Sequence, residues 1–473
     1  MSTTPRDVSS HRWSARDGGD RILSRAECAA IADRIARFAR GGGDTEVRVQ
    51  SWWGGELRWA RNRVSLASDR RDIVVQVVRT IRGAKGIAQT NQIDDASLEA
   101  AVRVAEREAR ITPTTPRDFE MPRPAFDYAK TMIWSDATYD RTAPERGAAA
   151  RALIDPAEAA GMLSAGYLGV RAEATSHFPV ANPPTYAAST RAECSMTVRD
   201  ARGAGSGWAG ASSYDIAAID APALAARALE KCLASRNPVA LEPGRYTVIL
   251  EPQAVHDLVS LITQRTALFR PFAEQGLGSF VAGYDDALKT WRSKLGSSVV
   301  DERITISHDP ADPLLGVVPF DENDEPYRPV TWIDHGVLET MYDHRPYALQ
   351  TRNDPLGHPN SGSYRMSGGE TSVDEMIAST KRGLIVTRFS DVMLLDESSL
   401  LATGLTRDGL WLVENGHITK AVKNLRFTES PLFVLNGIEQ LGAPVPVFSP
   451  EAPAIVPPLK ARDFSFTSVI DAI

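Results

Sequence analysis

The hydrophobic positions in the first fifth of the chain follow a helical repeat. Ile31, Ile35 and Phe38 recur at the spacing of one helical face, which predicts a helix over residues 22–41. Three consecutive glycines at 41–43 are typical of a helix end. The chain is therefore expected to open with an amphipathic helix that packs one face on a core.

Alternating hydrophobic and polar residues then predict strands. The stretch TEVRVQSWWGGELRWARNRVS predicts a hairpin that turns at Gly54 and Gly55. The stretch DIVVQVVRTIRGAKGIAQT predicts a second hairpin that turns between Gly83 and Gly86. A helical repeat returns over residues 96–110. Helix, strands and helix in this order indicate a sheet with one helical face.

The same alternation continues in the middle of the chain and dominates its second half. An Ala-rich helix, three antiparallel strands and a helix near 221–236 are predicted between 140 and 236. The strand RYTVIL is followed by PQAVHDLVSLITQ, which predicts an amphipathic helix opened by Pro252. Beyond residue 300 short strands prevail, with hairpin turns at His335-Gly336 and Asn415-Gly416 and one helix near 372–383.

These patterns predict an α+β fold of two domains, as the length of 473 residues also suggests. Residues 22–235 form the N-terminal α+β domain, with a Pro-rich connector near 112–124. Residues 240–448 form a β-rich C-terminal domain. Residues 1–21 are expected to be a disordered tail, and 449–473 are set apart as a C-terminal segment.

Composition excludes several classes of protein. Charged residues make up 24% and the formal net charge is -7, which offers no basic face for nucleic acid. Cys28, Cys194 and Cys232 lie far apart without a CxxC pair, so neither a disulfide framework nor a Cys-rich zinc site is predicted. No apolar run approaches ~18 residues and no signal peptide is visible, so we expect a cytoplasmic protein.

Two polar stretches invite a functional interpretation. The loop RNDPLGHPNSGSYRMSGGE at 352–370 is either a surface excursion or a lid in which His358, Ser361 and Tyr364 face a ligand. The stretch TGLTRDGLW at 403–411 has two glycines but lacks the GxxxxGK[ST] pattern, so it is interpreted as a hairpin connector. Neither a GxSxG elbow nor a GxGxxG turn after a strand occurs.

Longer blocks of the chain resemble a known family. These blocks are PVALEPGRYTVILEPQAVHDLVSLI, PFDENDEPYRPVTWIDHGVLETMYDHRPYA, RMSGGETSVDEMI and LLATGLTRDGLWLVENGHITKAVKNLRF. Together with the N-terminal hairpins they resemble the TldD/PmbA (TldE) family, which is called modulators of gyrase and is related to metallopeptidases. The resemblance covers about residues 25 to 445. It implies an N-terminal α/β layer domain and a C-terminal β-rich domain of the TldD/PmbA type.

In TldD-type members of that family, a helix with the motif HExxxH and a cysteine near the C-terminus hold zinc, and the glutamate acts as general base. The resemblance places His256 at the first histidine, Asp257 at the glutamate and Leu261 at the second histidine. The tighter HExxH spacing would place Ser260 there instead, and APVPVFSPEAPAIVPPLKA contains no cysteine. A single imidazole does not hold zinc against water. The site is therefore interpreted as degenerate, with candidates His256, Asp257 and Ser260 and with no metal bound by this chain.

The resemblance implies a PmbA/TldE-like, non-catalytic subunit that shapes the substrate chamber of a TldD-like partner, in which the zinc is expected. The substrate would be an extended peptide bound by strand addition. His335, His344, His358 and Tyr364 are the predicted substrate contacts. Whether the chain forms a heterodimer or a homodimer stays open.

The sequence leaves two other functions to weigh against this one. A hydrolase repurposed on the same fold would act on a peptide-like or amide-bearing metabolite, using His256 and Asp257 with His344 or His358. A scaffold for a DNA-linked process is disfavoured by the acidic charge, so neither nucleic acid nor a membrane is expected as a partner.

Overall fold

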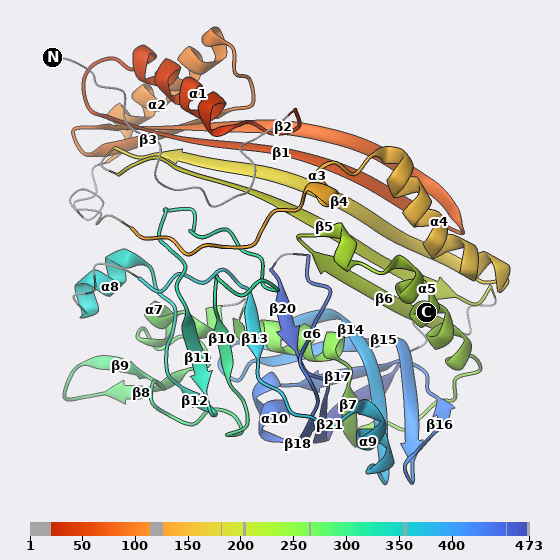
Figure 1. The fold of residues 1–473 in the computed structure, drawn as a ribbon. Helices are drawn as coiled ribbons and strands as arrows, with labels where there is room; N and C mark the ends of the chain where they lie inside the picture. The colour runs from red at the N-terminus through yellow and green to blue at the C-terminus, as the bar shows by residue number, and fades with distance from the viewer. Residues whose placement is uncertain are drawn as a thin grey trace.

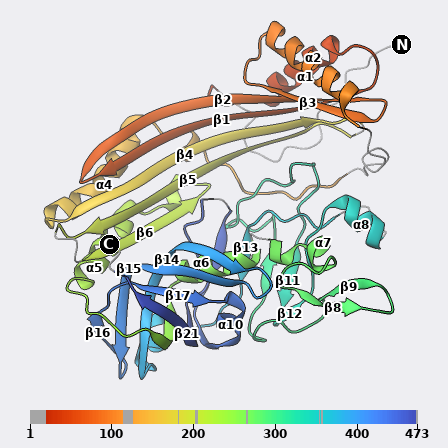
Figure 2. The same ribbon diagram turned by 180° about the vertical axis from the view of Figure 1, so that it is seen from behind.

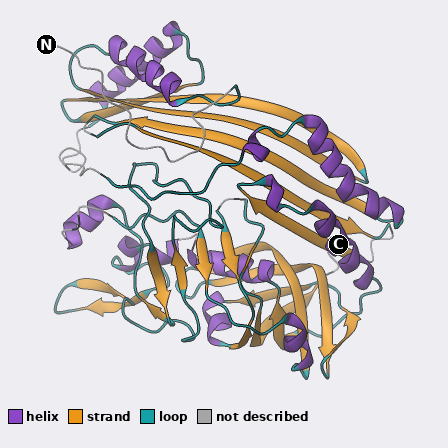
Figure 3. Ribbon diagram, viewed as in Figure 1, coloured by secondary structure: helices purple, strands orange, loops and turns teal. Residues whose placement is uncertain are grey.

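A computed structural model describes residues 20–113, 126–180, 182–201, 205–263, 266–352, 354, 357–450 and 452–470. The tail expected at 1–21 and the connector near 112–124 lie almost wholly outside these residues. Strands are more abundant than helices, as Figure 3 shows. Every helix within the described ranges is too short or too polar to cross a bilayer.

The N-terminal domain is built on one long antiparallel sheet in the order β3-β2-β1-β4-β5-β6. Its strands are β1 (Asp44–Ala60), β2 (Arg63–Ile81), β3 (Ala84–Thr90), β4 (Leu163–Phe178), β5 (Thr185–Arg199) and β6 (Ser206–Ser213). Its helices are α1 (Arg25–Phe38), α2 (Asp95–Ile111), α3 (Asp136–Tyr139), α4 (Ala143–Ala159) and α5 (Ala221–Ala234), with the 3-10 turn η2 (Ile216–Ala218). The sheet arches over the C-terminal domain, with α1 and α2 on its outer side at one end and α4 toward the other (Figure 1).

Alternation along the strands explains the two faces of this sheet. In β1, Val47, Val49 and Trp53 point outward and pack in one core with α1 and α2. A second core joins α4 and α5 to the other end of the sheet. Along each strand, the residues that alternate with these outward-pointing ones point to the inner face of the sheet. Figure 2 shows this face turned toward the C-terminal domain. Because the side-chain period of a strand is two, one face is apolar and the other is free to be polar.

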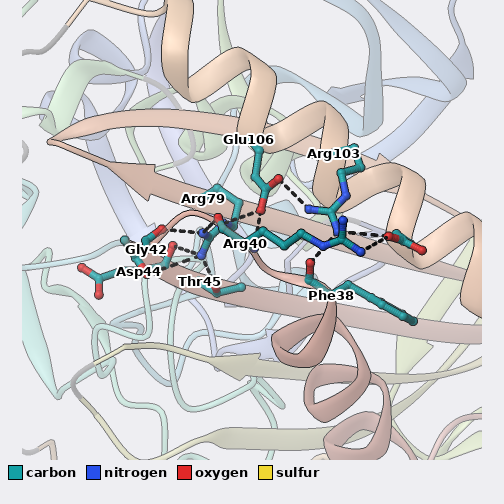
Figure 4. A network of polar contacts seen from close by, with 10 residues as sticks. Phe38, Arg40, Gly42, Asp44, Thr45, Arg79, Arg103 and Glu106 are labelled. Carbon is teal, nitrogen blue, oxygen red and sulfur yellow. Dashed lines mark hydrogen bonds and ion pairs between the residues drawn. The ribbon is translucent and has the colours of Figure 1, made fainter.

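The end of α1 is fixed by a buried arginine. Arg79 of β2 donates to the carbonyl oxygens of Gly42 at 2.7 Å and Arg40 at 3.1 Å (Figure 4). Glu106 of α2 accepts from the backbone N–H of Arg40 at 2.6 Å and pairs with Arg103. The glycine turn that the sequence predicted after this helix thus has its carbonyl groups satisfied by one guanidinium.

The C-terminal domain contains two further sheets. The larger one has the order β14-β7-β21-β17-β15-β16, and β14 also pairs with β15, so five of its strands close into a ring. Its strands are β7 (Gly244–Leu250), β14 (Arg382–Asp396), β15 (Leu401–Glu414), β16 (His417–Ala421), β17 (Leu425–Glu429), β21 (Leu459–Val469) and, paired with β21, β18 (Ile438–Leu441).

The second sheet has the order β12-β11-β10-β13-β20-β19. Its strands are β10 (Ile306–His308), β11 (Val330–Asp334), β12 (Val337–Leu338), β13 (Tyr364–Met366), β19 (Val445–Pro446) and β20 (Ala454–Val456); β8 (Val281–Asp285) and β9 (Thr290–Ser293) form a separate hairpin. The helices are α6 (Pro252–Thr263), α7 (Arg270–Ala273), α8 (Arg345–Arg352), α9 (Val373–Ala378) and α10 (Pro431–Asn436), with the 3-10 turn η3 (Thr266–Leu268).

The α+β class and the two-layer N-terminal domain are confirmed, but the first predicted turn is wrong. Strand β1 runs straight through Gly54 and Gly55, and the chain turns at Arg61 and Asn62, whose φ angles are 50° and 62°. A Cβ atom on Gly55 would lie 2.4 Å from the guanidinium of Arg146. This glycine therefore makes room for a packed side chain instead of a turn.

Two further predictions need correction. The stretch 403–411 is not a connector but lies inside β15, where Asp408 and Gly409 have φ angles of 57° and 134° and the pairing with β14 shifts register. The segment 449–473 does not stand apart from the C-terminal domain. Its strand β21 lies between β7 and β17 in the closed sheet.

Candidate functional site

Helix α6 connects directly to strand β7 and lies in the core of the C-terminal domain. Pro252 occupies the first helical position, where its fixed φ and missing N–H do no harm. Seven apolar or weakly polar residues of the helix are buried, and it contacts β14, β7, β20 and α10. The packing prediction for this amphipathic helix is confirmed, and its second turn carries His256 and Asp257, which resemble part of a metal-binding motif.

His256 is buried and bonded to an aromatic hydroxyl. Its Nδ1 lies 2.9 Å from the hydroxyl oxygen of Tyr364, and the two rings are stacked with centroids 5.9 Å apart. Tyr364 begins β13 and is fully buried. Burial lowers the pKa of His256 to about 4, so the imidazole is neutral at physiological pH. The structure thus brings together two predicted site residues, one as the packing partner of the other.

Asp257 holds the helix to the neighbouring sheet. Its Oδ2 accepts a hydrogen bond from the backbone N–H of Phe389 at 2.7 Å, and its Oδ1 accepts one from Gln253 Nε2 at 3.0 Å. Burial raises its pKa to about 6. Ser260 lies one turn further on, and its hydroxyl donates to the carbonyl oxygen of Asp257 at 3.4 Å. The side chains of His256, Asp257 and Ser260 are thus each directed at a backbone or side-chain partner.

A metal does not fit the side chains around this helix. Leu261, at the position expected for a second imidazole, is 4% exposed and belongs to the main core of the domain. Among the residues that the structure describes, no three His, Cys, Asp or Glu side chains gather in a way that could hold a metal ion. Three protein ligands are the minimum for catalytic zinc, and the helix offers one imidazole that already has a partner.

The other predicted contacts lie in different places. His335 is exposed in the β11–β12 turn beside Asp334, with Nδ1 2.9 Å from a carboxylate oxygen. His344 is exposed and packs against Phe269 and Tyr347. His358 is half-buried, and its backbone N–H donates to the buried Asp343 at 3.0 Å. The contacts of these histidines involve residues other than those that His256 contacts. Their roles as substrate contacts stay predictions.

A cavity lies between the two domains instead. It has a volume of about 460 Å³ and is bounded by the inner face of β4, β5 and β6 on one side. On the other side it is bounded by C-terminal-domain segments, among them Leu314, Val317, Ser361 and Pro453. Its size falls in the range of small-ligand sites, which lies at about 300–1,000 Å³.

Comparison with known proteins finds a family model that matches the C-terminal domain. Residues 243–468 match the model of the PmbA/TldA metallopeptidase C-terminal domain. The C-terminal domain of this chain is therefore similar to the PmbA/TldA metallopeptidase C-terminal domain. No curated protein matches the chain.

Solved structures extend the likeness to the N-terminal domain. A proposed modulator of a DNA gyrase from Thermotoga maritima MSB8 has a TM-score of 0.79 at 17% identity, covering 93% of this chain and 100% of that one. A second proposed modulator of DNA gyrase, from Bacteroides thetaiotaomicron VPI-5482, has a TM-score of 0.76 at 17% identity, covering 93% and 98%. TldE from Thermococcus kodakarensis has a TM-score of 0.76 at 14% identity, covering 93% and 99%. At these identities the likeness establishes the shared fold.

Both domains carry buried histidines that no sequence motif marks as functional. His308 of β10 is 1% exposed, and its Nδ1 lies 2.9 Å from the Ser363 hydroxyl. Ser363 in turn lies 2.7 Å from the hydroxyl of Ser361 at the cavity wall. His177 at the end of β4 pairs through Nδ1 with buried Asp324 of the C-terminal domain. Single histidines far apart in sequence give no spacing signal, so only the fold reveals these partners.

The charged cavity residues did leave a trace in the sequence. The triplet RAE occurs in two neighbouring strands, as Arg171 to Glu173 in β4 and as Arg191 to Glu193 in β5. In each strand the charged residues alternate with buried alanines. Such alternation predicts antiparallel strands, and here the charges at every second position also lie on the face that the C-terminal domain covers.

Proposed function

We propose that this chain is a TldE/PmbA-like subunit that has no metal site of its own and shapes the substrate chamber of a zinc-bearing TldD-like partner. The observation that carries the proposal is the state of α6. His256 is bonded to Tyr364, and Leu261 is part of the core where a second imidazole would be required. The substrate proposed for the complex is an extended, unfolded peptide.

The shape of the chain supports this role. The long sheet of the N-terminal domain stands over the C-terminal domain with a polar inner face. Such a subunit would contribute one wall of the chamber and leave the metal chemistry to its partner. It would keep the two-domain framework without the side chains that bind the metal. A homodimer of the chain would have the same wall but would bring no zinc helix, so the proposal favours a heterodimer.

The test compares the chain alone with the chain co-purified with a TldD-type subunit from the same organism. We expect no stoichiometric zinc in the isolated chain and no cleavage of an unfolded protein such as reduced casein. We expect both in the complex. The matched control is His256→Phe, which keeps a ring in the same space and should leave zinc content and cleavage by the complex unchanged. Zinc bound by the isolated chain at one equivalent, or cleavage by it alone, would overturn the proposal.

A further inference from the structure

The wall that the N-terminal domain contributes to the cavity carries an ordered pattern of charges. Arg171 and Arg191 lie directly opposite each other in the pairing of β4 with β5. Arg171 pairs with Glu173 at 3.0 Å, and Arg191 pairs with Glu193 at 2.8 Å. Two like charges side by side on neighbouring strands are unfavourable by themselves. Each carboxylate offsets one guanidinium, so the wall holds two positive and two negative groups close together.

These charges are accessible to different degrees. The side chain of Arg171 is 49% exposed and that of Glu173 is 31% exposed. Arg191 also donates to the carbonyl oxygen of Ser449, which ties it to the C-terminal domain. A guanidinium has five N–H donors in a planar fork, so one carboxylate does not saturate Arg171. Arg171 is therefore the group best placed to receive a second anion.

The opposite wall is apolar. Leu314 is 55% exposed, and Val317 and Pro453 line the cavity beside it. An exposed leucine that faces a charged wall across a cavity presents a surface on which an aliphatic side chain could be buried. The cavity therefore suits a ligand with charged groups on one side and an apolar side chain on the other.

A hydroxyl group fixed by hydrogen bonds also faces the cavity, from the side of the C-terminal domain. Ser361 lines the cavity, and its Oγ is 2.7 Å from Ser363 Oγ, which is 2.9 Å from Nδ1 of buried His308. The loop is fixed further by Asn360, which donates to the carbonyl oxygen of Thr263 at 2.7 Å. A serine fixed by a chain of hydrogen bonds has lost its rotational freedom before a ligand arrives, which favours binding.

We propose that the cavity between the domains binds a short peptide with free amino and carboxyl termini and an aliphatic side chain. The carboxylate would lie against Arg171 and Arg191, the ammonium group against Glu173 and Glu193, and the side chain against Leu314 and Val317. Ser361 would contact the peptide group. This inference deepens the proposed function and rests on it for its biological sense, since short peptides are what a peptidase chamber takes up or releases.

The equal numbers of positive and negative groups on the cavity wall favour a zwitterionic ligand. A simple anion would leave Glu173 and Glu193 facing it, and a simple cation would leave the two arginines facing it. Unmatched charges in a partly buried site are costly, while a ligand with both charges matches both pairs. Planar guanidinium groups also bind carboxylates through two parallel hydrogen bonds, which lysine cannot do.

Isothermal titration of the isolated chain with leucyl-leucine tests the inference. We expect saturable binding, and about tenfold weaker binding for both N-acetyl-leucyl-leucine and leucyl-leucine amide, because each lacks one charge. Arg171→Met should weaken binding of the free dipeptide by about tenfold as well. Arg151→Met is the matched control, since Arg151 lies on α4 with its side chain 77% exposed, and it should bind as the wild type does.

Several outcomes would overturn the inference. These are no saturation by the free dipeptide, equal affinity for the blocked peptides, or equal effects of Arg171→Met and Arg151→Met. If Arg171→Met fails to fold, Leu314→Asp at the apolar wall replaces it and should also weaken binding by about tenfold. The experiment needs neither zinc nor a partner subunit. Its failure therefore leaves the proposed function standing, and zinc bound by the isolated chain would remove that function without touching the binding result.

Discussion

Helix α6 and the cavity between the domains differ in how their polar side chains are used. In α6, His256 and Asp257 each have well-placed partners within the core of one domain. At the cavity, Arg171 and Glu173 meet as a half-exposed pair on a wall that a second domain covers. The first set resembles a catalytic motif in sequence, and the second resembles an ordinary strand. The difference shows that residue type indicates chemistry only where the surroundings leave a side chain accessible.

The pKa values of the helix agree with this reading. Burial lowers the pKa of His256 to about 4 and raises that of Asp257 to about 6. Burial shifts both groups toward their neutral forms, as expected for polar groups that serve packing. A metal ligand would also be a neutral imidazole, so the argument against a metal rests on the missing further ligands and not on these pKa values.

The largest expected effect comes from restoring the missing ligand. We expect Leu261→His to lower the free energy of unfolding by about 3 kcal/mol or more, because it removes a buried aliphatic group and buries an unpaired imidazole. Urea unfolding with and without added zinc measures this. Leu261→Met is the control and should cost less than about 1.5 kcal/mol. A variant that took up one zinc and became more stable would show that one added imidazole is enough to make α6 a metal-binding helix.

A smaller effect is expected from the partner of His256. Tyr364→Phe should cost about 1–3 kcal/mol, because it leaves a buried imidazole nitrogen without its hydrogen bond. The double variant with His256→Leu should be less destabilised than the sum of the two single variants, by about 0.5–3 kcal/mol. Thermal and urea unfolding of all four proteins measure this coupling. Strict additivity would mean that the bond contributes nothing and that His256 is kept for another reason.

Much of the fold follows from local patterns. The capped helix α1, the β2–β3 hairpin and the turns at His335-Gly336 and Asn415-Gly416 all have sequence signals that the structure confirms. The turn predicted at Gly54-Gly55 does not exist. Position 55 needs a glycine because the side chain of Arg146, 91 positions away in the chain, packs against it. The position of β21 between β7 and β17 was not predicted for the same physical reason, because strand pairing depends on residues far apart in the sequence.

The site was less predictable than the fold. The absence of a second ligand at Leu261 could be read directly from the sequence. The hydrogen-bond partner of His256 could not be predicted, because Tyr364 lies 108 positions further along the chain, in strand β13. Tyr364 was expected to face a ligand from a polar loop, but it starts β13 and is fully buried. Arg171 and Arg191 lie opposite each other because of the register between β4 and β5, and no local sequence pattern fixes that register.

A pH-dependent effect is expected at the link between the domains. Burial alone would lower the pKa of His177, but its hydrogen bonds to Asp324 and Glu46 raise it above the ordinary value of 6.5. A raised folded pKa gives stability that is complete below the unfolded pKa and is lost as pH rises through the folded pKa.

We therefore expect the wild type to lose stability relative to His177→Gln as the pH rises above the ordinary histidine pKa of 6.5. Melting temperatures measured from below to above this pH test the expectation. The loss should be modest, because a neutral imidazole still donates to Asp324. A difference between the two proteins that stays constant with pH, or grows as the pH rises, would show that the charge on His177 does not hold the domains together.

The smallest effect is expected at the cavity, and it separates a ligand site from a structural ion pair. Arg171→Met should change the free energy of unfolding by less than about 1 kcal/mol, because half-exposed ion pairs are screened by water. Arg79→Met is the comparison, since Arg79 is a buried arginine whose guanidinium donates to four backbone carbonyls, and its loss should cost about 3 kcal/mol or more. Urea unfolding of both variants measures the contrast. If Arg171 proved as costly to remove as Arg79, its charge would be needed for the fold, and weaker peptide binding by Arg171→Met would no longer argue for a contact with the ligand.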